Sequence, residues 1–245
     1  MTYFESNWAV VVPMANESAE FAPFVRLLEK VISGLGSGTV YFIVDGASKD
    51  NTLKLCQDQS ARDARFITVW APENRHLVDA YVRGFREAYE RGHEIIVEMD
   101  AGMSHDPRAI PMFLRVLNEG NECAFGSRYI NGGSNVDSPL KRRFFSRTGT
   151  LLAQVLLGAR LHDMTSGFQG FRAAVVGDLL KAQLHSTTHF YQTEVRHLLR
   201  KRRIIEVPIH YRAPSPRISE SALRNSLKVL FHYTRLRFLA RSPII

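Results

Sequence analysis

Acidic and basic side chains that can bind phosphorylated ligands recur at a few points along the chain. Asp45 and Asp100 each close a strand-like run, and Arg128 follows another. A carboxylate can accept hydrogen bonds from a nucleotide or hold a divalent cation, and a guanidinium group matches the oxygens of a phosphate. The combination predicts a site for a phosphorylated ligand and a metal ion.

The segment 45–52 has the features of a nucleotide-binding turn. Asp45 can accept a hydrogen bond from a base N–H group, and the small residues after it allow a ligand to approach closely. We expect a helix over 48–60, with Ser48 as its N-cap and Asp50 in its first turn. An ordinary strand–turn–helix connection explains the same pattern and is the simpler interpretation of this segment alone.

Asp100 is a candidate metal ligand at the end of the predicted strand 94–99. A divalent cation such as Mg²⁺ takes one or two protein carboxylates and fills its coordination shell with phosphate oxygens and water. Asp106 precedes Pro107, and we interpret it as the N-cap of the next helix. His105 is either a surface residue or a further metal ligand.

Basic residues gather after residue 126. Arg128 is followed by the run 141–143 and by Ser146. The planar guanidinium group suits phosphate, and Arg142 and Ser146 share one helix face because they are four residues apart. These residues predict a second phosphate site, although the solvated basic start of a helix explains them about equally well.

Strand-like runs precede most of these residues. The predicted strands cover 7–13, 39–45, 66–70, 94–99 and 122–127. The predicted helices between them cover 21–32, 48–60 and 76–91, and a fourth begins at 106. This alternation predicts an α/β fold with a mostly parallel sheet and helices on both faces. Such sheets bind ligands beyond the carboxyl ends of their strands. Polar segments follow four of these ends, at 16–17, 45–52, 100–106 and 127–128.

The pattern becomes less regular after residue 130. We expect helices at 144–157, 191–201 and 219–241, a strand at 204–209, and a polar stretch at 163–172. The last helix has apolar residues along one side, namely Leu223, Leu227, Leu230, Phe231, Thr234 and Phe238. Basic residues lie elsewhere on it, so we expect a basic amphipathic helix.

The composition describes a globular protein. Apolar residues make up 45% of the 245 positions and charged residues 23%, which excludes a disordered chain. No apolar run approaches the roughly 18 residues that span a bilayer. The N-terminus has no basic region of the kind that begins a secretory signal. Two cysteines, Cys56 and Cys123, are too few for a disulfide framework, and we expect reduced thiols.

The net charge of +8 comes from the C-terminal part of the chain. Residues 196–245 contain 12 Lys or Arg residues and only two acidic ones, Glu206 and Glu220. Such a surface suits an anionic membrane or another acidic partner, although a solvated helical face is the simpler explanation of the charge alone. No aromatic residues alternate with these charges for stacking on bases, so we expect no nucleic acid partner.

Together and in this order, the polar segments resemble those of the family 2 glycosyltransferases, which have a GT-A fold. The closest subgroup is the dolichyl- and polyprenyl-phosphate mannosyltransferases. The matching stretches are 11–13 with 16–17, 44–52, 75–84, 99–107, 126–134, 146–147, 163–172 and 206–209. The resemblance covers roughly residues 7–232. Each motif alone is weak, and eight in the same order are specific.

The resemblance implies a role for individual residues. The donor nucleotide sugar, GDP-mannose or a UDP-sugar, would be bound by Pro13, Asn16, Glu17, Asp45 and Arg75, the last near its diphosphate. Arg128, Arg142 and Ser146 would bind the acceptor lipid phosphate. The catalytic residues would be Asp100, Asp163 and Arg128, with Asp163 near the reacting sugar.

The metal site departs from the pattern of the family. The family usually has Asp-x-Asp, whereas this chain has Asp100, Ala101 and Gly102. Asp100 would hold Mg²⁺ or Mn²⁺, with His105 as a candidate further ligand, and the missing carboxylate puts the metal affinity in doubt. Gly102→Asp is expected to restore the second carboxylate and to tighten metal binding.

The resemblance implies inverting transfer of a hexose, with mannose favoured, from a nucleoside diphosphate to a polyprenyl or dolichyl phosphate. Two alternatives stay open. A family 2 glycosyltransferase that acts on a soluble or glycan hydroxyl would need a general base, for which Asp163 is the candidate. The chain could also be a nucleotide-sugar-binding protein that has lost catalysis, which would explain why Gly102 stands in place of the second aspartate of the family.

The same resemblance suggests how the chain is organised. Residues 1–218 would form the GT-A catalytic domain, and residues 219–245 a basic amphipathic helix at the membrane surface. The protein would then be cytoplasmic and peripheral at the cytoplasmic face of an anionic membrane, where a membrane-protein partner is conceivable.

Overall fold

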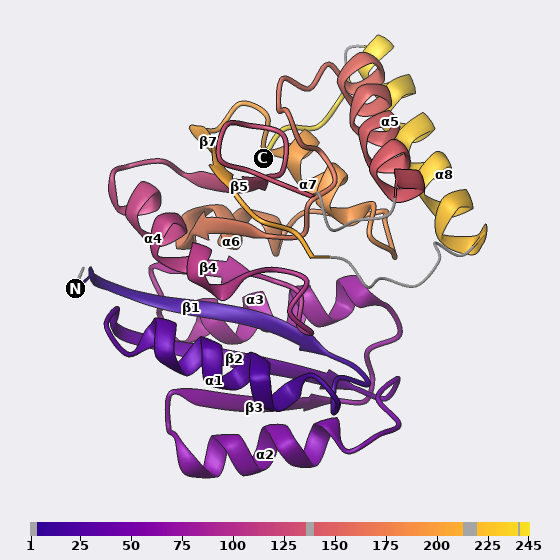
Figure 1. Cartoon of the computed structure of the whole chain (residues 1–245). Coiled ribbons are helices and arrows are strands. Elements are labelled where there is room, and N and C mark those ends of the chain that lie inside the picture. Colours follow the sequence, from indigo (N-terminus) through magenta and orange to yellow (C-terminus); the bar gives the residue numbers. More distant parts are fainter. Residues whose placement is uncertain (1–3, 136–139, 213–219, 240) are drawn as a thin grey trace.

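The computed structural model describes residues 4–135, 140–212, 220–239 and 241–245, without the side chains of Phe4, Glu5, Lys141, Arg142 and Phe145. Figure 1 shows the chain as one sheet with surrounding helices. The strands are β1 (Phe4–Met14), β2 (Gly36–Asp45), β3 (Phe66–Ala71), β4 (Ile95–Glu98), β5 (Cys123–Ser127), β6 (Gln169–Arg172) and β7 (Ile204–Pro208). The helices are α1 (Phe21–Ile32), α2 (Thr52–Arg62), α3 (Leu77–Glu90), η1 (Pro107–Ala109), α4 (Ile110–Asn118), α5 (Leu140–Leu157), α6 (Ala173–Leu179), α7 (Tyr191–Leu198) and α8 (Glu220–Phe238).

The strands follow the order β3-β2-β1-β4-β6-β5-β7 across the sheet. β1 pairs in parallel with β2 and β4, β2 with β3, and β5 with β7. Of the described strands only β6 runs antiparallel, between β4 and β5. The predicted α/β fold with a mostly parallel sheet is confirmed. β6 falls in the stretch 163–172, where no strand was predicted, because four residues are too few to show a period.

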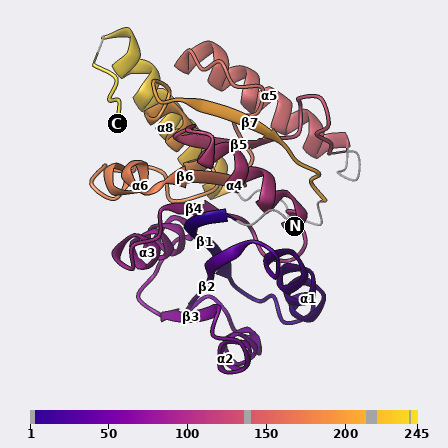
Figure 2. The ribbon, with the colours of Figure 1, turned by 90° about the vertical axis from the view of Figure 1, so that its left-hand side faces the viewer.

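Helices cover both faces of the sheet (Figure 2). Both faces of β1 are buried, which explains why its residues 8–14 are all apolar. Val10 and Val12 pack in the core formed with α1 and α4, whereas Val11 packs in the core formed with α3, α6 and α7 on the other face. Cys56 and Cys123 are buried free thiols, and burial raises the pKa of each to about 12.

Helix α2 begins later than the sequence suggested. Its first residue is Thr52 and its N-cap is Asn51, so the expected cap at Ser48 is wrong. Asp50 is the reason, because its carboxylate accepts hydrogen bonds from the backbone N–H groups of Ser18 (3.1 Å) and Thr52 (3.0 Å). Hydrogen bonds from the side chains of Ser18 and Thr52, together with these backbone bonds, hold the pKa of Asp50 well below its usual value. The bonds tie the start of α2 to the loop after β1.

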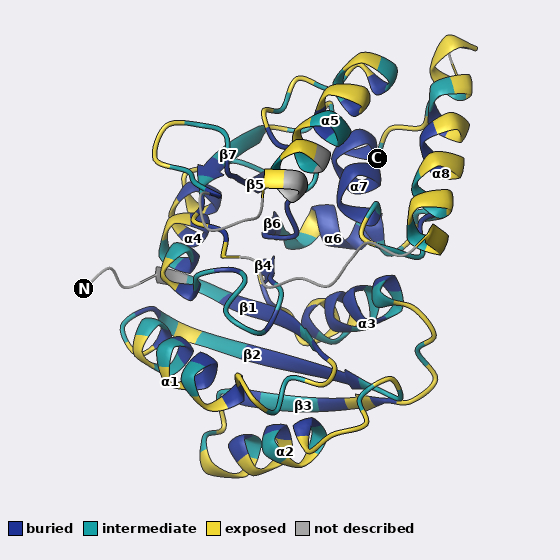
Figure 3. Ribbon diagram, turned by 45° about the vertical axis from the view of Figure 1, so that its right-hand side comes forward, coloured by how far each residue is buried: buried dark blue, intermediate teal, exposed yellow. Residues whose placement is uncertain are grey.

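Helices α5 and α8 lie side by side (Figure 1). Much of the surface of both helices is exposed (Figure 3). Leu230 and Tyr233 of α8 are buried in a third apolar cluster with Ala153 and Leu157 of α5. Leu230 therefore does not share the exposure of Leu223, Leu227, Phe231 and Phe238. The exposed apolar residues of the two helices are Leu140, Phe144, Leu151, Leu152, Val155, Leu223, Leu227, Phe231 and Phe238. Within the described residues, every helix is too short or too polar to cross a bilayer.

Candidate active site

The order of the strands brings two acidic loops together. β1 lies between β2 and β4, so the strand order reverses between β1 and β4. Open α/β sheets bind ligands beyond the carboxyl ends of their strands at such a reversal. β1 ends at Met14 and β4 ends at Glu98. The loops that follow these two strands carry Glu17 and Asp100, which therefore belong to one site.

Asn16 fixes the loop after β1. Its backbone has a φ of 58°, a conformation that Asn tolerates better than most residues. Its side chain donates to the Ala47 carbonyl (3.2 Å) and accepts from the Lys49 N–H (2.8 Å). Its backbone N–H donates to Ser48 Oγ (3.2 Å). Asn16, which the resemblance assigns to the donor, thus uses both ends of its amide to join the loops after β1 and β2.

The other predicted donor residues lie along the same edge of the sheet. Pro13 pairs with Ile43 in the parallel register of β1 and β2, and Asp45 ends β2. One Asp45 oxygen accepts a hydrogen bond from the Ala47 N–H (2.9 Å). Arg75 lies exposed in the connection between β3 and α3. Pro13 and Asp45 thus lie at the carboxyl ends of β1 and β2, and Arg75 follows the end of β3, the strand next to β2.

Asp100 is held on two sides. Its Oδ1 accepts a hydrogen bond from the Tyr81 hydroxyl of α3 (2.6 Å), and its backbone N–H donates to His105 Nδ1 (3.0 Å). The His105 ring is completely buried against Phe168 and Tyr211, and burial lowers its pKa. His105 is therefore neutral with its proton on Nε2, which has no hydrogen-bond partner among the described residues.

The end of β4 fits a divalent cation that a phosphorylated ligand helps to hold. Asp100 can supply a carboxylate, and a diphosphate and water can complete the shell of Mg²⁺ or Mn²⁺. The predicted ligand His105 already uses Nδ1 to accept a hydrogen bond, so its ring supports the Asp100 backbone. In the described part of the chain no group of three or more His, Cys, Asp or Glu side chains could hold an ion by itself.

The Glu17 carboxylate lies next to Gly102. A Cβ atom on Gly102 would lie 2.6 Å from Glu17 Oε2, and Gly102 has a φ of +67°. Burial raises the pKa of Glu17, and nearby carboxylates, Asp100 foremost, raise it further. Gly102→Asp would therefore have to displace the Glu17 carboxylate, and whether it tightens metal binding stays a prediction.

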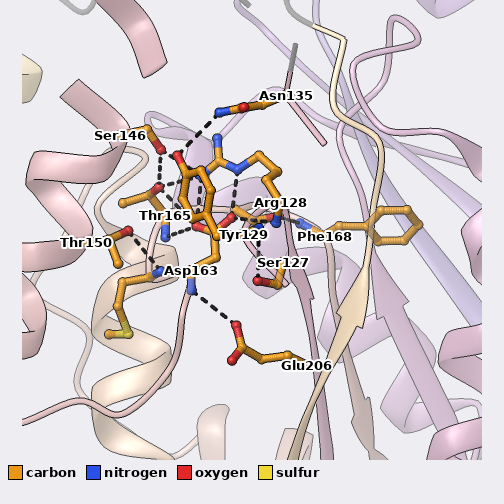
Figure 4. A network of polar contacts seen from close by, with 12 residues as sticks. Ser127, Arg128, Tyr129, Asn135, Ser146, Thr150, Asp163, Thr165, Phe168 and Glu206 are labelled. Carbon is orange, nitrogen blue, oxygen red and sulfur yellow. Dashed lines mark hydrogen bonds and ion pairs between the residues drawn. The ribbon is translucent and has the colours of Figure 1, made fainter. Parts of the chain in front are cut away.

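Arg128 and Asp163 form a buried ion pair beyond β5 (Figure 4). Arg128 Nε donates to Asp163 Oδ2 (2.7 Å), and Nη2 donates to Oδ1 (2.8 Å). Nη2 also donates to Ser146 Oγ (2.8 Å) and Thr165 Oγ1 (2.6 Å). Burial alone would raise the pKa of Asp163, but the charge and hydrogen bonds of Arg128 outweigh burial and hold this pKa below its usual value. Asp163 is thus an ionised partner of Arg128.

The predicted acceptor residues Arg128 and Ser146 are in direct contact, whereas the Arg142 side chain lies outside the described residues. The rings of Tyr129 and Tyr211 face the Arg128 guanidinium group at 5.3 and 5.4 Å. Tyr129, Arg147, Thr150, Leu151, Gln154 and His162 line a pocket of ≈ 280 Å³ beside α5. This pocket is next to the Arg128 group, because Tyr129 both lines it and faces the Arg128 guanidinium group.

Several buried polar residues behind the site gave no signal in the sequence. Glu98 accepts hydrogen bonds from the Gln169 amide and the Tyr191 hydroxyl, and burial raises its pKa to about 8. Arg196 is also buried, and its charge acts on Asp163 and Glu98. These side chains sit on a strand and a helix that are otherwise apolar and buried. Only the contacts between elements distinguish them from ordinary core positions.

Curated proteins with related sequences are lipid-phosphate mannosyltransferases. An undecaprenyl-phosphate mannosyltransferase of Micrococcus luteus is 32% identical over 69% of this chain and 70% of that protein. A polyprenol monophosphomannose synthase of Mycolicibacterium smegmatis is 29% identical over 77% of this chain and 72% of that protein. A dolichol-phosphate mannosyltransferase of Pyrococcus furiosus is 26% identical over 93% of this chain and 61% of that protein.

Solved structures with the same fold include glucosyl-3-phosphoglycerate synthase from Mycobacterium tuberculosis in complex with Mn²⁺, uridine diphosphate and phosphoglyceric acid. It superposes with a TM-score of 0.65 at 17% identity, over 98% of this chain and 80% of that one. This likeness confirms the GT-A fold.

Residues 9–180 match the sequence profile of glycosyl transferase family 2. This span covers more than half of the chain and contains both loops at the strand reversal and the Arg128–Asp163 pair. The chain therefore belongs to glycosyl transferase family 2 and is a glycosyltransferase.

Proposed function

We propose that this glycosyltransferase moves a mannosyl group from a nucleoside diphosphate sugar, with GDP-mannose as the first candidate, to a polyprenyl phosphate. The names of the three relatives support the sugar and the acceptor. The observation that carries the proposal is the ion pair of Arg128 with Asp163. It favours an acceptor that is already ionised over one that must first lose a proton.

The hydrogen bonds and the ionisation of Asp163 favour a phosphate acceptor over a hydroxyl acceptor. A general base needs a free oxygen that faces its substrate and a pKa near the working pH. Both Asp163 oxygens accept hydrogen bonds from Arg128, and the pKa of Asp163 lies below its usual value. A hydroxyl acceptor would depend on such a base. A phosphate monoester has a second pKa near 6, is largely dianionic at pH 7 and needs none.

Arg128 keeps some capacity for the acceptor phosphate. Its Nε and Nη2 make all its side-chain hydrogen bonds to described residues, which leaves the N–H groups of Nη1 for a phosphate oxygen. Arg143, at the start of α5, adds a further positive charge that would help two anionic substrates to meet. On the donor side, Tyr81 orients the Asp100 carboxylate. A divalent ion there would stabilise the departing diphosphate as a Lewis acid.

We also propose that catalysis takes place at the cytoplasmic face of the membrane, to which the protein binds peripherally. Residues 1–218 would form the catalytic domain, and residues 219–245 would carry a membrane-facing helix. The exposed apolar residues of α5 and α8 support this view, because basic residues such as Arg147, Arg224 and Lys228 are exposed on the same two helices. Helices of this composition bind anionic membrane surfaces.

Co-sedimentation with vesicles tests this membrane contact. Binding to vesicles that contain anionic lipid should fall as NaCl is raised, because salt screens the charges of α5 and α8. The double variant Leu227→Ser with Phe231→Ser should bind at least about ten-fold more weakly, since burying one such side chain is worth about 1.5–3 kcal/mol. Trp70→Ser is the matched control, because Trp70 is 44% exposed on β3. Equal binding to neutral and anionic vesicles would contradict the electrostatic contribution.

Arg142→Ala should impair use of the acceptor while donor binding stays nearly intact. A charge-assisted hydrogen bond is worth about 1.5–3 kcal/mol, so kcat/KM for the polyprenyl phosphate should fall about 10- to 150-fold. Arg160→Ala removes an exposed positive charge beyond the end of α5 and serves as the control. Steady-state kinetics with a short polyprenyl phosphate measures both variants. Wild-type kinetics in Arg142→Ala would remove Arg142 from the acceptor site.

A substrate screen tests the proposed function as a whole. Purified protein is incubated with GDP-mannose, UDP-glucose or UDP-N-acetylglucosamine, with and without Mn²⁺, and with a short polyprenyl phosphate or a free glycan as acceptor. We expect mannosyl transfer from GDP-mannose to the lipid phosphate. Transfer to the glycan hydroxyl alone would favour the alternative acceptor. Nucleotide binding without transfer to either acceptor would favour a binding protein.

A further inference from the structure

Glu17 and Asp100 lie on neighbouring loops where the strand order reverses. Glu17 follows β1, Asp100 follows β4, and these strands are hydrogen-bonded neighbours. Glu17 Oε2 lies 2.6 Å from the point where a Cβ atom of Gly102 would stand, two residues beyond Asp100. The Glu17 carboxylate thus fills space that a side chain at position 102 would need.

The backbone of both loops is specialised for this arrangement. Gly102 and Met103 have φ values of 67° and 63°, and Asn16, directly before Glu17, has 58°. Such values are uncommon outside glycine and persist where the surrounding structure holds them. Asn16 is anchored to the loop after β2, and the Glu17 N–H donates to Thr52 Oγ1 (2.8 Å). The position of Glu17 is therefore fixed by its backbone.

The carboxylate of Glu17 has no partner in the described part of the chain. Among the residues that the structure describes, none donates a hydrogen bond to it or forms an ion pair with it, although it is partly buried. The negative charge of Asp100 acts on it as well. Two carboxylates in such proximity repel each other, and a divalent cation shared between them removes this repulsion. Mg²⁺ and Mn²⁺ are bound by one or two carboxylates together with phosphate oxygens.

We propose that Glu17 is a second carboxylate ligand of the divalent cation that accompanies the donor diphosphate, and that it replaces the side chain that position 102 lacks. This inference rests on the proposed function and deepens it. Glu17 then serves the metal, whereas the resemblance of the sequence assigned it to the nucleotide sugar. The two carboxylates of the metal site would then come from the loops after β1 and β4, and not from the loop after β4 alone.

Calorimetric titration of Mn²⁺ into the full chain, saturated with GDP or in parallel with UDP, tests the role of Glu17. Glu17→Gln keeps the shape of the side chain and removes its charge. The Kd for Mn²⁺ should rise at least about ten-fold, because even the loss of a residue that only supports a ligand costs that much. The nucleotide Kd without metal should stay within about two-fold. Glu20→Gln removes the same charge three residues later, at an exposed position, and should leave the Mn²⁺ Kd unchanged.

A carboxylate supplied by the other loop provides a second test. Glu17→Ala frees the space beside position 102, and aspartate tolerates a positive φ better than most residues. The double variant Glu17→Ala with Gly102→Asp should therefore recover most of the Mn²⁺ affinity that Glu17→Ala loses. Circular dichroism with thermal unfolding establishes that each variant is folded before its titration is interpreted.

The outcomes separate this inference from the proposed function. If wild-type protein binds nucleotide and Mn²⁺ together and Glu17→Gln binds Mn²⁺ equally well, Glu17 is not a ligand and the proposed function still stands. If Glu17→Gln weakens GDP or UDP binding by the same factor without metal, Glu17 belongs to the nucleotide and the inference is again overturned. If the wild-type protein binds no nucleotide with Mn²⁺, the proposed function itself fails.

Discussion

Asp100→Asn should lower kcat for transfer from GDP-mannose to a polyprenyl phosphate by at least about a hundred-fold. Asparagine keeps an oxygen that can accept the hydrogen bond from Tyr81 (2.6 Å), so the loop after β4 should keep its shape. The variant loses the negative charge at the end of β4 and with it the metal. Lewis-acid stabilisation of a leaving diphosphate is worth several kcal/mol, and about 2.7 kcal/mol already corresponds to a hundred-fold.

Asp106→Asn is the matched control for Asp100→Asn. The Asp106 carboxylate accepts from the Arg108 N–H (3.0 Å) at the start of η1 and pairs with the Arg108 side chain. Asparagine keeps an oxygen for this cap and loses only the ion pair with the exposed Arg108 side chain, so the variant should lose at most about 1 kcal/mol of stability and little activity. Both rates are measured over a range of Mn²⁺ concentrations. A kcat of Asp100→Asn that matches the wild type at every concentration would contradict the metal role of Asp100.

Arg128→Met should lower the free energy of unfolding by about 3–5 kcal/mol. Arg128 and Asp163 are almost fully buried, with side-chain exposures of 6% and 0%. Removing one partner of such a pair leaves the other as an uncompensated charge in the interior. Ser146 and Thr165 also lose a donor. Equilibrium unfolding in urea measures the effect.

A double variant shows whether the loss comes from the unpaired charge. Arg128→Met with Asp163→Leu replaces both ions by apolar side chains and should recover part of the stability, because it removes the unpaired charge. The backbone N–H groups of Arg128 and Thr165, which donate to Asp163, lose their acceptor in this variant, so the recovery should be incomplete. Arg147→Met is the exposed control, and its contact with the Tyr129 ring (5.4 Å) is worth about 0.5–1 kcal/mol. If the single variant Arg128→Met lost less than about 1 kcal/mol, the buried charge of Asp163 would have found another partner.

The alternation of strands and helices was readable from the sequence because it depends on local periods. Both faces of β1 are buried, so its residues are apolar in succession, and the strand appears as an uninterrupted run. Helix α1 begins and ends where its apolar spacing predicted, at Phe21 and Ile32. β6 was missed because its four residues are held mainly by pairing with β4 and β5, which no local period reports.

The chemistry of the site was also partly readable. Carboxylates and arginines at strand ends follow from the rule that ligands bind beyond the carboxyl ends of parallel strands. Asp45 ends β2, and Asp100 and Arg128 each lie within two residues beyond a strand end. Their order along the chain was enough to reveal the resemblance to family 2 glycosyltransferases, because several weak motifs in a fixed order are specific.

The sequence by itself thus determined the fold class, the family and the residue types at the site, since these depend on short-range pattern and chain order. The tertiary structure decided how those residues are paired. Arg128 and Asp163 are 35 residues apart in sequence, and only the packing of β5 against the 163–168 segment makes Asp163 an ionised partner in place of a free base. Glu17 reaches the space beside Gly102 only because β1 and β4 are neighbours. Contacts between distant segments depend on strand order and register, which local sequence does not encode.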